Sequence, residues 1–172
     1  MIRSWGIVTL TGAAQPIVGD KITAAFVVPA AGQLAKVQVA STTRYQVGDR
    51  IILGAGQTGA NILKVVQIIS GTILGCESEG NAVLSAWVVN TIIQLSIACS
   101  IIKFQAITGN AGGVWIGSDN TVTNVGGGSS FEQLLGGGND SIGQPPANSI
   151  RSSEGWMAGT LNDKVGVAVV VV

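Results

Sequence analysis

The sequence "GAGQTG" at residues 54–59 is the stretch whose spacing comes nearest to a cofactor-binding motif. Its glycines have the spacing of a dinucleotide-binding turn, and Glu77 and Glu79 follow about twenty residues later, where such sites place an acid for the ribose. This chemistry requires a helix directly after the glycines, because the pyrophosphate rests on the N–H groups at the helix start. The decisive question is therefore whether residues 62–69 form a helix.

The segment "ILKVVQII" at residues 62–69 favours a strand by composition. Five of its eight residues are Val or Ile, whose branched side chains pack well on a pleated surface. The threefold spacing of Lys64 and Gln67 fits a helix, but the segment is short for the crossover helix of a βαβ unit. We therefore predict a hairpin, with a strand at 49–53, a glycine loop at 54–61 and a strand at 62–69. A nucleotide-binding enzyme remains one of three alternative functions, and the other two are given below.

Other groups that carry chemistry are sparse. The chain has no histidine, which removes the commonest general base and the commonest metal ligand, and it has no GxSxG nucleophile elbow. The stretches "GSDN" (117–120) and "GGND" (137–140) offer oxygen ligands for calcium, but Asp and Asn also stabilise turns, and we adopt the turn interpretation. We expect no enzymatic activity, no catalytic residue, no metal site and no cofactor.

The two cysteines, Cys76 and Cys99, leave two alternatives open. They can pair as a disulfide, or they can be two buried free thiols. The second interpretation is favoured, because two cysteines without a CxxC pattern carry little information on their own.

The composition indicates a protein that buries surface against other chains. Charged residues make up 10% of the chain, against about 25% in an ordinary soluble domain. Hydrophobic residues make up 47%, and the mean hydropathy is +0.49. So few charges cover the surface poorly, and we expect some apolar surface to be buried in an oligomer or a larger assembly. The formal net charge is +0 without any basic stretch, so we expect no nucleic-acid partner.

Residues 81–102 carry no charge and are long enough to span a membrane. Polar residues such as Asn90, Thr91 and Gln94 interrupt them, and two strands that meet near "VNT" explain the segment better. The stretch "MIRSWGIVTLTG" lacks the long apolar core of a signal peptide. We therefore expect no association with a membrane.

Short β-branched runs bounded by turn residues predict an all-β fold with glycine-rich loops and little helix. The run "VAVVVV" must lie inside a sheet or pair with another subunit, because an exposed edge of this kind promotes aggregation. The glycine-rich loop at 126–149 is either an arm around a neighbour or a surface loop, and 130–137 predict one turn of helix closed by Gly136. The predicted strands are 4–11, 24–29, 34–41, 49–53, 62–69, 72–76, 82–89, 91–107, 113–118, 121–125, 153–159 and 164–172.

Residues 26–83 resemble a small β-module that recurs in structural proteins of tailed bacteriophages. The matching pieces are Val28-Pro29, Gly32, "YQVGDRIILGAG", "LKVVQIISGT" and "EGNAV". In that module the glycines form the tip of a hairpin, which agrees with the interpretation of "GAGQTG" given above.

Residues 101–124 and 155–172 resemble a small phage virion β-sandwich, whose usual "L.PG" turn is replaced here by "LLGGG". Members of that family often begin with a strand like "GIVTLTGAAQPI", so residues 4–17 are expected to complete this domain, with the first module inserted. The resulting expectation is two small β-barrel or β-sandwich domains. Their predicted limits are an N-terminal arm or strand at 1–21, a barrel-like module at 22–98 and a sandwich at 99–172.

The resemblance implies a structural virion protein, namely a capsid decoration or cement protein on the outer surface of the phage head. It implies the major capsid protein and further copies of the chain, as a homotrimer, as partners. The second functional alternative is a head-fibre, collar or tail-associated protein that binds a host glycan through Tyr45 and the glycine loops. Large aromatic residues dominate interface energies, so the tryptophans are candidate interface anchors. The alternative for each tryptophan is packing in the core, which we expect for Trp87. The candidate interface residues are Trp5, Trp115, Phe131, Leu134, Leu135 and Trp156.

Overall fold

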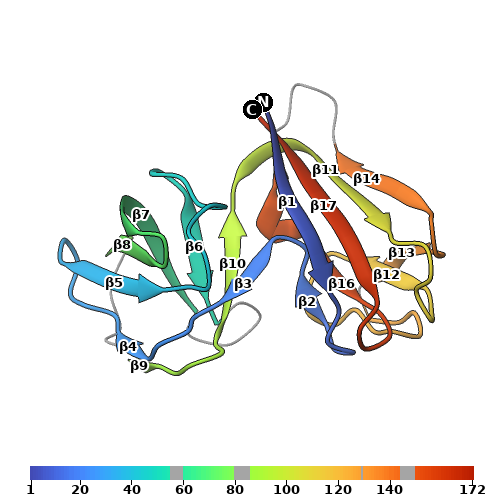
Figure 1. Cartoon of the computed structure of the whole chain (residues 1–172), viewed down its shortest axis with the longest axis horizontal. Coiled ribbons are helices and arrows are strands. Elements are labelled where there is room, and N and C mark those ends of the chain that lie inside the picture. Colours follow the sequence, from blue (N-terminus) through green and yellow to red (C-terminus); the bar gives the residue numbers. More distant parts are fainter. Residues whose placement is uncertain (55–59, 80–85, 129, 144–149) are drawn as a thin grey trace. The chain divides into compact units, whose positions relative to one another are not determined.

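The described residues form an almost purely β-structured protein. They include 17 strands and one short 3-10 helix, η1 (Ser152–Glu154), so the predicted all-β fold is confirmed. The chain divides into two compact units: unit 1 comprises residues 1–18 and 97–172, and unit 2 comprises residues 19–96. The computed structural model (Figure 1) describes residues 1–54, 60–79, 86–128, 130–143 and 150–172.

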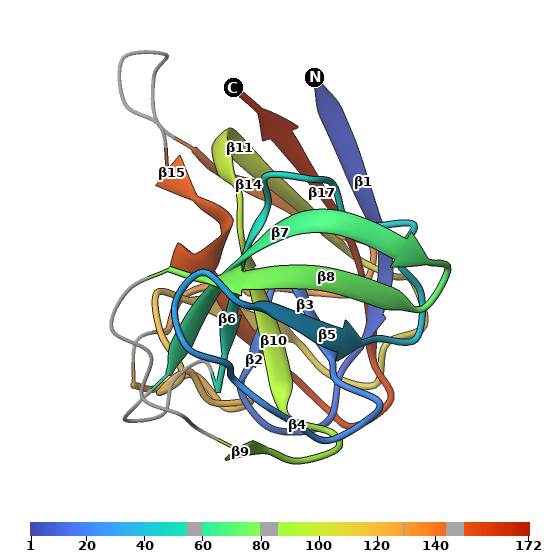
Figure 2. The ribbon, with the colours of Figure 1, turned by 90° about the vertical axis from the view of Figure 1, so that its left-hand side faces the viewer.

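Unit 2 is built on one curled antiparallel sheet, whose strands β5, β7 and β8 lie side by side in Figure 2. Ile22 follows β3 and Val39 follows β5, the two outermost strands of this sheet, and an isolated antiparallel bridge joins these two residues. The sheet therefore curls toward closure. A small separate pair is formed by β4 (Phe26–Val27) and β9 (Ala86–Trp87). The order across the sheet is β3 (Gly19–Lys21), β10 (Ile92–Ser96), β6 (Arg50–Leu53), β7 (Asn61–Ser70), β8 (Ile73–Ser78) and β5 (Leu34–Gln38).

The core of unit 2 follows from strict alternation along its strands. In β5, Ala35 and Val37 are buried while Lys36 and Gln38 are exposed. The same period of two in β7 buries Leu63 and Val65. Successive side chains of a strand point to opposite faces, so one face of the curled sheet lines the core.

Unit 1 contains two sheets, and the first is central to its organisation. Its order is β1 (Ile2–Thr9), β17 (Lys164–Val171), β11 (Ala98–Ala106) and β14 (Asn139–Gly143), with β15 (Ile150–Arg151) also pairing with β11. The valine-rich strand β17 pairs on both sides, with β1 and with β11. The prediction that "VAVVVV" lies inside a sheet is therefore confirmed.

The second sheet of unit 1 has the order β13 (Ser130–Leu134), β12 (Val114–Gly117), β16 (Trp156–Ala158) and β2 (Gln15–Pro16). Both N-terminal strands thus pair within unit 1, β1 with β17 and β2 with β16. The inward faces of β17 and β11 are fully apolar, with Val165, Val167 and Val169 on one strand and Ile102 and Phe104 on the other. Burial of these β-branched and aromatic side chains is the main stabilising term of the unit.

A β-bulge in β1 determines which residues of that strand face the core. The register with β17 shifts between Ser4 and Gly6, and Gly6 has a left-handed φ of 86°. One additional residue in a strand resets its alternation. Trp5 is consequently buried, while Ser4 and Ile7 on either side of the bulge are both exposed.

Three sequence predictions differ from the structure in unit 1. Residues 121–125 form turns instead of a strand. Residues 130–134 form strand β13 instead of a helical turn, because pairing with β12 supplies their backbone hydrogen bonds. The stretch 126–149 is not one long loop, since it contributes β13 to one sheet and β14 to the other; residues 129 and 144–149 lie outside the described residues.

The uncharged stretch 81–102 contains β9, β10 and the start of β11, and residues 81–85 lie outside the described part. A turn at Asn90, with a left-handed φ of 70°, separates β9 from β10, close to the predicted position. Across the described residues, no helix reaches the length and hydropathy needed to cross a membrane.

Candidate functional site

The glycine motif belongs to a hairpin. Strands β6 and β7 pair antiparallel, with Arg50 opposite Lys64 and Leu53 opposite Asn61, so the predicted hairpin is confirmed. Residues 55–59, which hold most of "GAGQTG", lie outside the described residues. Residues 61–70 are a strand, and the helix start that a dinucleotide turn directs at a pyrophosphate does not follow the glycines.

The acidic pair Glu77 and Glu79 balances cations on neighbouring strands. Arg50 lies directly opposite Lys64, which places two like charges across β6 and β7. Glu77 lies opposite Lys64 across β7 and β8, and Glu79 Oε2 lies 2.6 Å from Arg50 Nε. The two carboxylates therefore reduce repulsion on the sheet surface.

The two stretches considered for calcium use their carboxylates locally. Asp119 Oδ1 accepts hydrogen bonds from Thr121 N at 2.8 Å and from Thr121 Oγ1 at 2.6 Å, which is the predicted turn chemistry. Asp140 Oδ1 accepts one from Ser141 N at 2.6 Å. Within the described residues, no three His, Cys, Asp or Glu side chains gather in a group that could hold a metal.

The thiols and the single tyrosine are all buried. Cys76 in β8 and Cys99 in β11 are free thiols, which is the favoured of the two alternatives. Burial raises the pKa of Cys76 to about 12, so its thiol is protonated and weakly nucleophilic at neutral pH. Tyr45 is 5% exposed and donates a hydrogen bond to Asp20 Oδ2. It does not face solvent, contrary to the role considered for it in glycan binding.

The candidate interface residues divide into core and surface positions. Trp5, Leu134 and Trp156 are buried in unit 1, which is the core alternative stated for the tryptophans. Leu135 is 68% exposed, and Trp115 is half-buried with its ring over Gly126. The side chain of Phe131 lies outside the described part. In unit 2, Trp87 is half-buried and donates from Nε1 to Asn61 Oδ1 at 2.9 Å.

A shallow groove of about 760 Å³ lies on the outer face of the first sheet of unit 1 and is the best candidate for a functional site. The register aligns its residues in two rows across the strands. One row runs through Ser4, Ala168, Lys103 and Ser141, and the other runs through Ile7, Gly166, Gln105 and Asn139.

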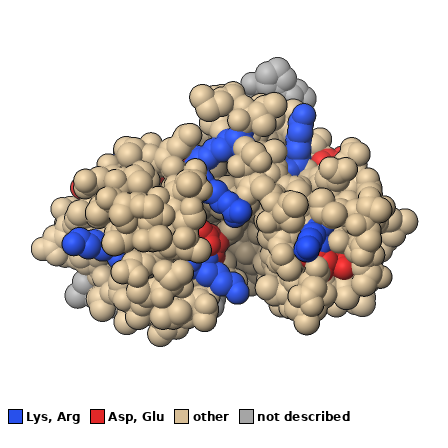
Figure 3. Space-filling view, viewed as in Figure 1, with Lys and Arg blue, Asp and Glu red and all other residues tan. Residues whose placement is uncertain are grey.

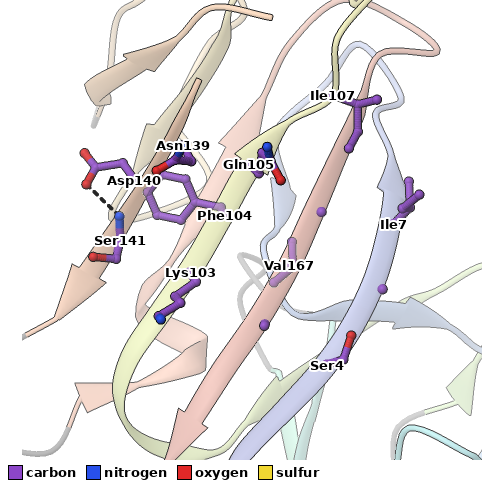
Figure 4. Close-up of a pocket in the computed structure, with 13 residues that line it drawn as sticks. Ser4, Ile7, Lys103, Phe104, Gln105, Ile107, Asn139, Asp140, Ser141 and Val167 are labelled. Atoms are coloured by element: carbon purple, nitrogen blue, oxygen red, sulfur yellow. Dashed lines mark hydrogen bonds between the residues drawn. The ribbon is translucent and has the colours of Figure 1, made fainter. Parts of the chain in front are cut away.

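The groove follows the middle of β17, because the outward residues Gly166 and Ala168 have little or no side chain, whereas Lys164 and Val170 on the same face have large ones. Gly166 and Ala168 form the floor, on the strand that carries Val167 in Figure 4. The floor lies between Ile7 of β1 and the pair Lys103 and Gln105 of β11, and all three of these flanking side chains are exposed. The site thus combines an aliphatic wall, a polar wall with a cation, and an unobstructed strand between them.

Sequence reasoning missed this site. It identified β17 as an interior strand from its valines but gave no role to the glycine that interrupts "KVGVAVVVV". An isolated glycine within a strand pattern is a known signal for a bulge or for the close approach of another backbone. That signal was available at Gly166.

Comparison of the chain with protein-family models, with curated proteins and with solved structures gives no match. The likeness to phage modules therefore depends only on the residues quoted for it.

Proposed function

We propose that this chain is a structural protein of a tailed-phage virion, a decoration or cement protein that binds across major capsid protein subunits on the outside of the head. In this role the chain acts through surface burial, with hydrogen bonding at the rim. Its partners are the major capsid protein and further copies of itself in a homotrimer. The proposal draws its biological setting from the phage-module resemblance.

The observation that carries the proposal is the amount of large apolar side chain left exposed. Stable interfaces have apolar centres depleted in charge, and the chain offers surface of that kind in both units. On the side seen in Figure 3, charged side chains are sparse and uncharged surface predominates. The exposed large hydrophobic residues are Met1, Ile2, Ile7, Val27, Leu34, Val47, Ile62, Ile68, Ile69, Val88, Val89, Val125, Leu135, Leu161 and Val172.

The groove on unit 1 supports a binding role because it lies on a rigid element. Its lining residues come from strands of one hydrogen-bonded sheet, β1, β17, β11 and β14, and this pairing fixes the spacing of Ile7, Gly166 and Lys103. Binding surfaces held on regular strands lose little conformational entropy when a partner docks.

The copy number of the chain in virions tests the proposal. Particles of the phage that encodes the chain are purified on density gradients, and the chain and the major capsid protein are quantified by mass spectrometry with labelled peptide standards. An abundance close to that of the capsid protein supports a decoration role. A small fraction of that abundance contradicts it in favour of a vertex or tail fitting, and absence from the particle rejects a virion role altogether. Native mass spectrometry of the purified chain tests the homotrimer separately.

A further inference from the structure

Gly166 is a glycine that its own fold does not require. It lies inside β17, opposite Ile7 on one side and Gln105 on the other. Its φ lies outside the left-handed region, so its backbone conformation is open to other residues. A Cβ built on it would meet Gln105 O and Ile107 Cδ1 at 3.9 Å, which is ordinary van der Waals contact.

Other strand and near-strand glycines of the chain differ from Gly166 because neighbouring atoms crowd them. A Cβ on Gly75 would lie 3.2 Å from Gln67 Cβ, and one on Gly159 would lie 2.4 Å from Leu10 Cδ1. Glycine weakens a strand through its unfolded-state entropy and its missing side chain. At Gly166 no internal contact in the described residues accounts for this cost, so the reason for the bare position lies outside the unit.

We propose that Gly166 and Ala168 keep the floor of the groove bare so that an extended polypeptide segment of a partner can lie along β17. The inference rests on the proposed function, under which the segment belongs to the major capsid protein. Close approach of a second backbone is one of the positions for which glycine is selected within a strand. The groove is open to solvent, so an extended chain can reach its floor.

The walls of the groove specify the chemistry of that segment. The Lys103 side chain is exposed, and its ammonium group has no ion pair or hydrogen bond with another described residue. The carboxylate of the nearby Asp140 already accepts a hydrogen bond from the Ser141 N–H. Charge complementarity therefore places a carboxylate of the segment beside Lys103. Ile7, 59% exposed, lies across β17 from Lys103, and the half-buried Ile107 follows the end of β11; both offer contact to an aliphatic side chain.

The decisive variant is Gly166→Val, which fills the floor with a side chain whose Cβ meets its neighbours at ordinary van der Waals distance. The isolated variant is expected to melt at the same temperature as the parent chain or higher, because a β-branched residue replaces glycine in a strand. Binding is measured by cosedimentation with gradient-purified particles of a phage that lacks the gene for this chain. The affinity of the variant for these particles is expected to fall by at least about tenfold relative to the parent chain. Lys103→Glu is expected to weaken binding and to leave the melting temperature unchanged.

Matched controls keep the test specific. Ala98→Val adds bulk at an exposed position of β11 outside the groove, and Lys36→Glu reverses an exposed charge on β5 of unit 2. Both are expected to bind as the parent does. Gly75→Ala is the control for a glycine that its neighbours crowd, and its melting temperature is expected to fall.

Four results would overturn the inference. A lower melting temperature for Gly166→Val would mean that the fold itself needs the glycine. Equal binding of Gly166→Val and the parent would leave the proposed function intact but remove the groove from it. A changed oligomeric state in native mass spectrometry with unaltered particle binding would identify a second copy of the chain as the occupant. Failure of the parent chain itself to bind particles would reject the proposed function and the inference together.

Discussion

The Tyr45 hydroxyl donates a 3.0 Å hydrogen bond to Asp20 Oδ2 from a position that is 5% exposed. This bond joins the chain just before β6 to strand β3, and it needs the phenol in its protonated form. Burial is the main cause that raises the pKa of Tyr45 above its ordinary value, and the negative charge of Asp20 adds to it.

Unit 2 is therefore expected to lose stability at alkaline pH. The unfolded chain releases the tyrosine proton near pH 10, while the folded chain retains it, so the free energy of unfolding falls as pH rises above about 10. Tyr45→Phe is expected to flatten this part of the pH profile and to cost about 1 kcal/mol at pH 7 through loss of the hydrogen bond. Urea unfolding at pH 7, 9 and 10.5 measures both effects. A variant with the same alkaline slope as the parent would contradict the assignment.

Cys76 gives a second, separate alkaline effect. Burial raises its pKa to about 12, so the folded state keeps the thiol protonated at pH values where the unfolded chain ionises. The Cys76 contribution to stability is thus lost progressively from its ordinary pKa, 9.0, up to about 12. In a Cys99→Ala background, the native chain at pH 8 is expected to react with a thiol reagent much more slowly than the chain in urea. Equal rates in the two conditions would mean that Cys76 is accessible.

Among the acidic residues of unit 1, Asp163 is the one whose substitution is expected to lower the free energy of unfolding most. It is 4% exposed, and its two carboxylate oxygens accept hydrogen bonds from Ala111 N at 2.7 Å and Gly112 N at 3.1 Å. Asp163→Ala leaves both N–H groups without their partner and is expected to lower the free energy of unfolding by about 2–4 kcal/mol. Asp119→Ala, which removes exposed bonds within one turn, is the control and is expected to cost less than about 1 kcal/mol. Similar losses for both variants would contradict this ranking.

Two glycines with left-handed backbone separate conformational strain from steric crowding. Gly109 has a φ of 93° and open space around a Cβ, whereas a Cβ on Gly128, φ 58°, would overlap the carbonyl oxygen of Thr121. Gly109→Ala is expected to cost about 1 kcal/mol from strain alone, and Gly128→Ala clearly more. Chemical denaturation of both variants makes the comparison. A larger loss at Gly109 would contradict the close approach at Gly128.

The sequence was sufficient for features that depend on local pattern. The valine run placed β17 inside a sheet, and the Val and Ile content of residues 62–69 distinguished a strand from a helix after the glycines. Prediction from the sequence failed where pairing with a strand distant in the chain determines the secondary structure. Residues 130–134 carry no strong strand signal and become a strand only because β12 lies beside them.

The candidate site shows the same division. Trp5 looked like an exposed anchor because nothing in the sequence fixes the bulge at Gly6 that turns it inward. The groove depends on three strands far apart in the chain, so the neighbours Ile7, Gly166 and Lys103 could not be brought together by spacing. Only the interruption of a valine run by a glycine pointed to it, and a single glycine has several possible causes.

The pairing of β1 with β17 has a consequence for how the molecule forms. All of unit 2 lies between these two strands in the chain, so unit 1 can close its first sheet only after more than 150 residues have been brought back on themselves, with Ile2 meeting Val170. Contacts of such high sequence separation slow folding, whereas the strands of unit 2 are neighbours in a continuous stretch. During synthesis unit 2 is therefore the part that can become compact first, while β1 remains unpaired and the side chain of Trp5, which the fold buries, stays uncovered. A ribosome-bound chain is most prone to aggregate in that interval. The folding step that we expect to depend most on cellular folding factors is the pairing of β17 with β1.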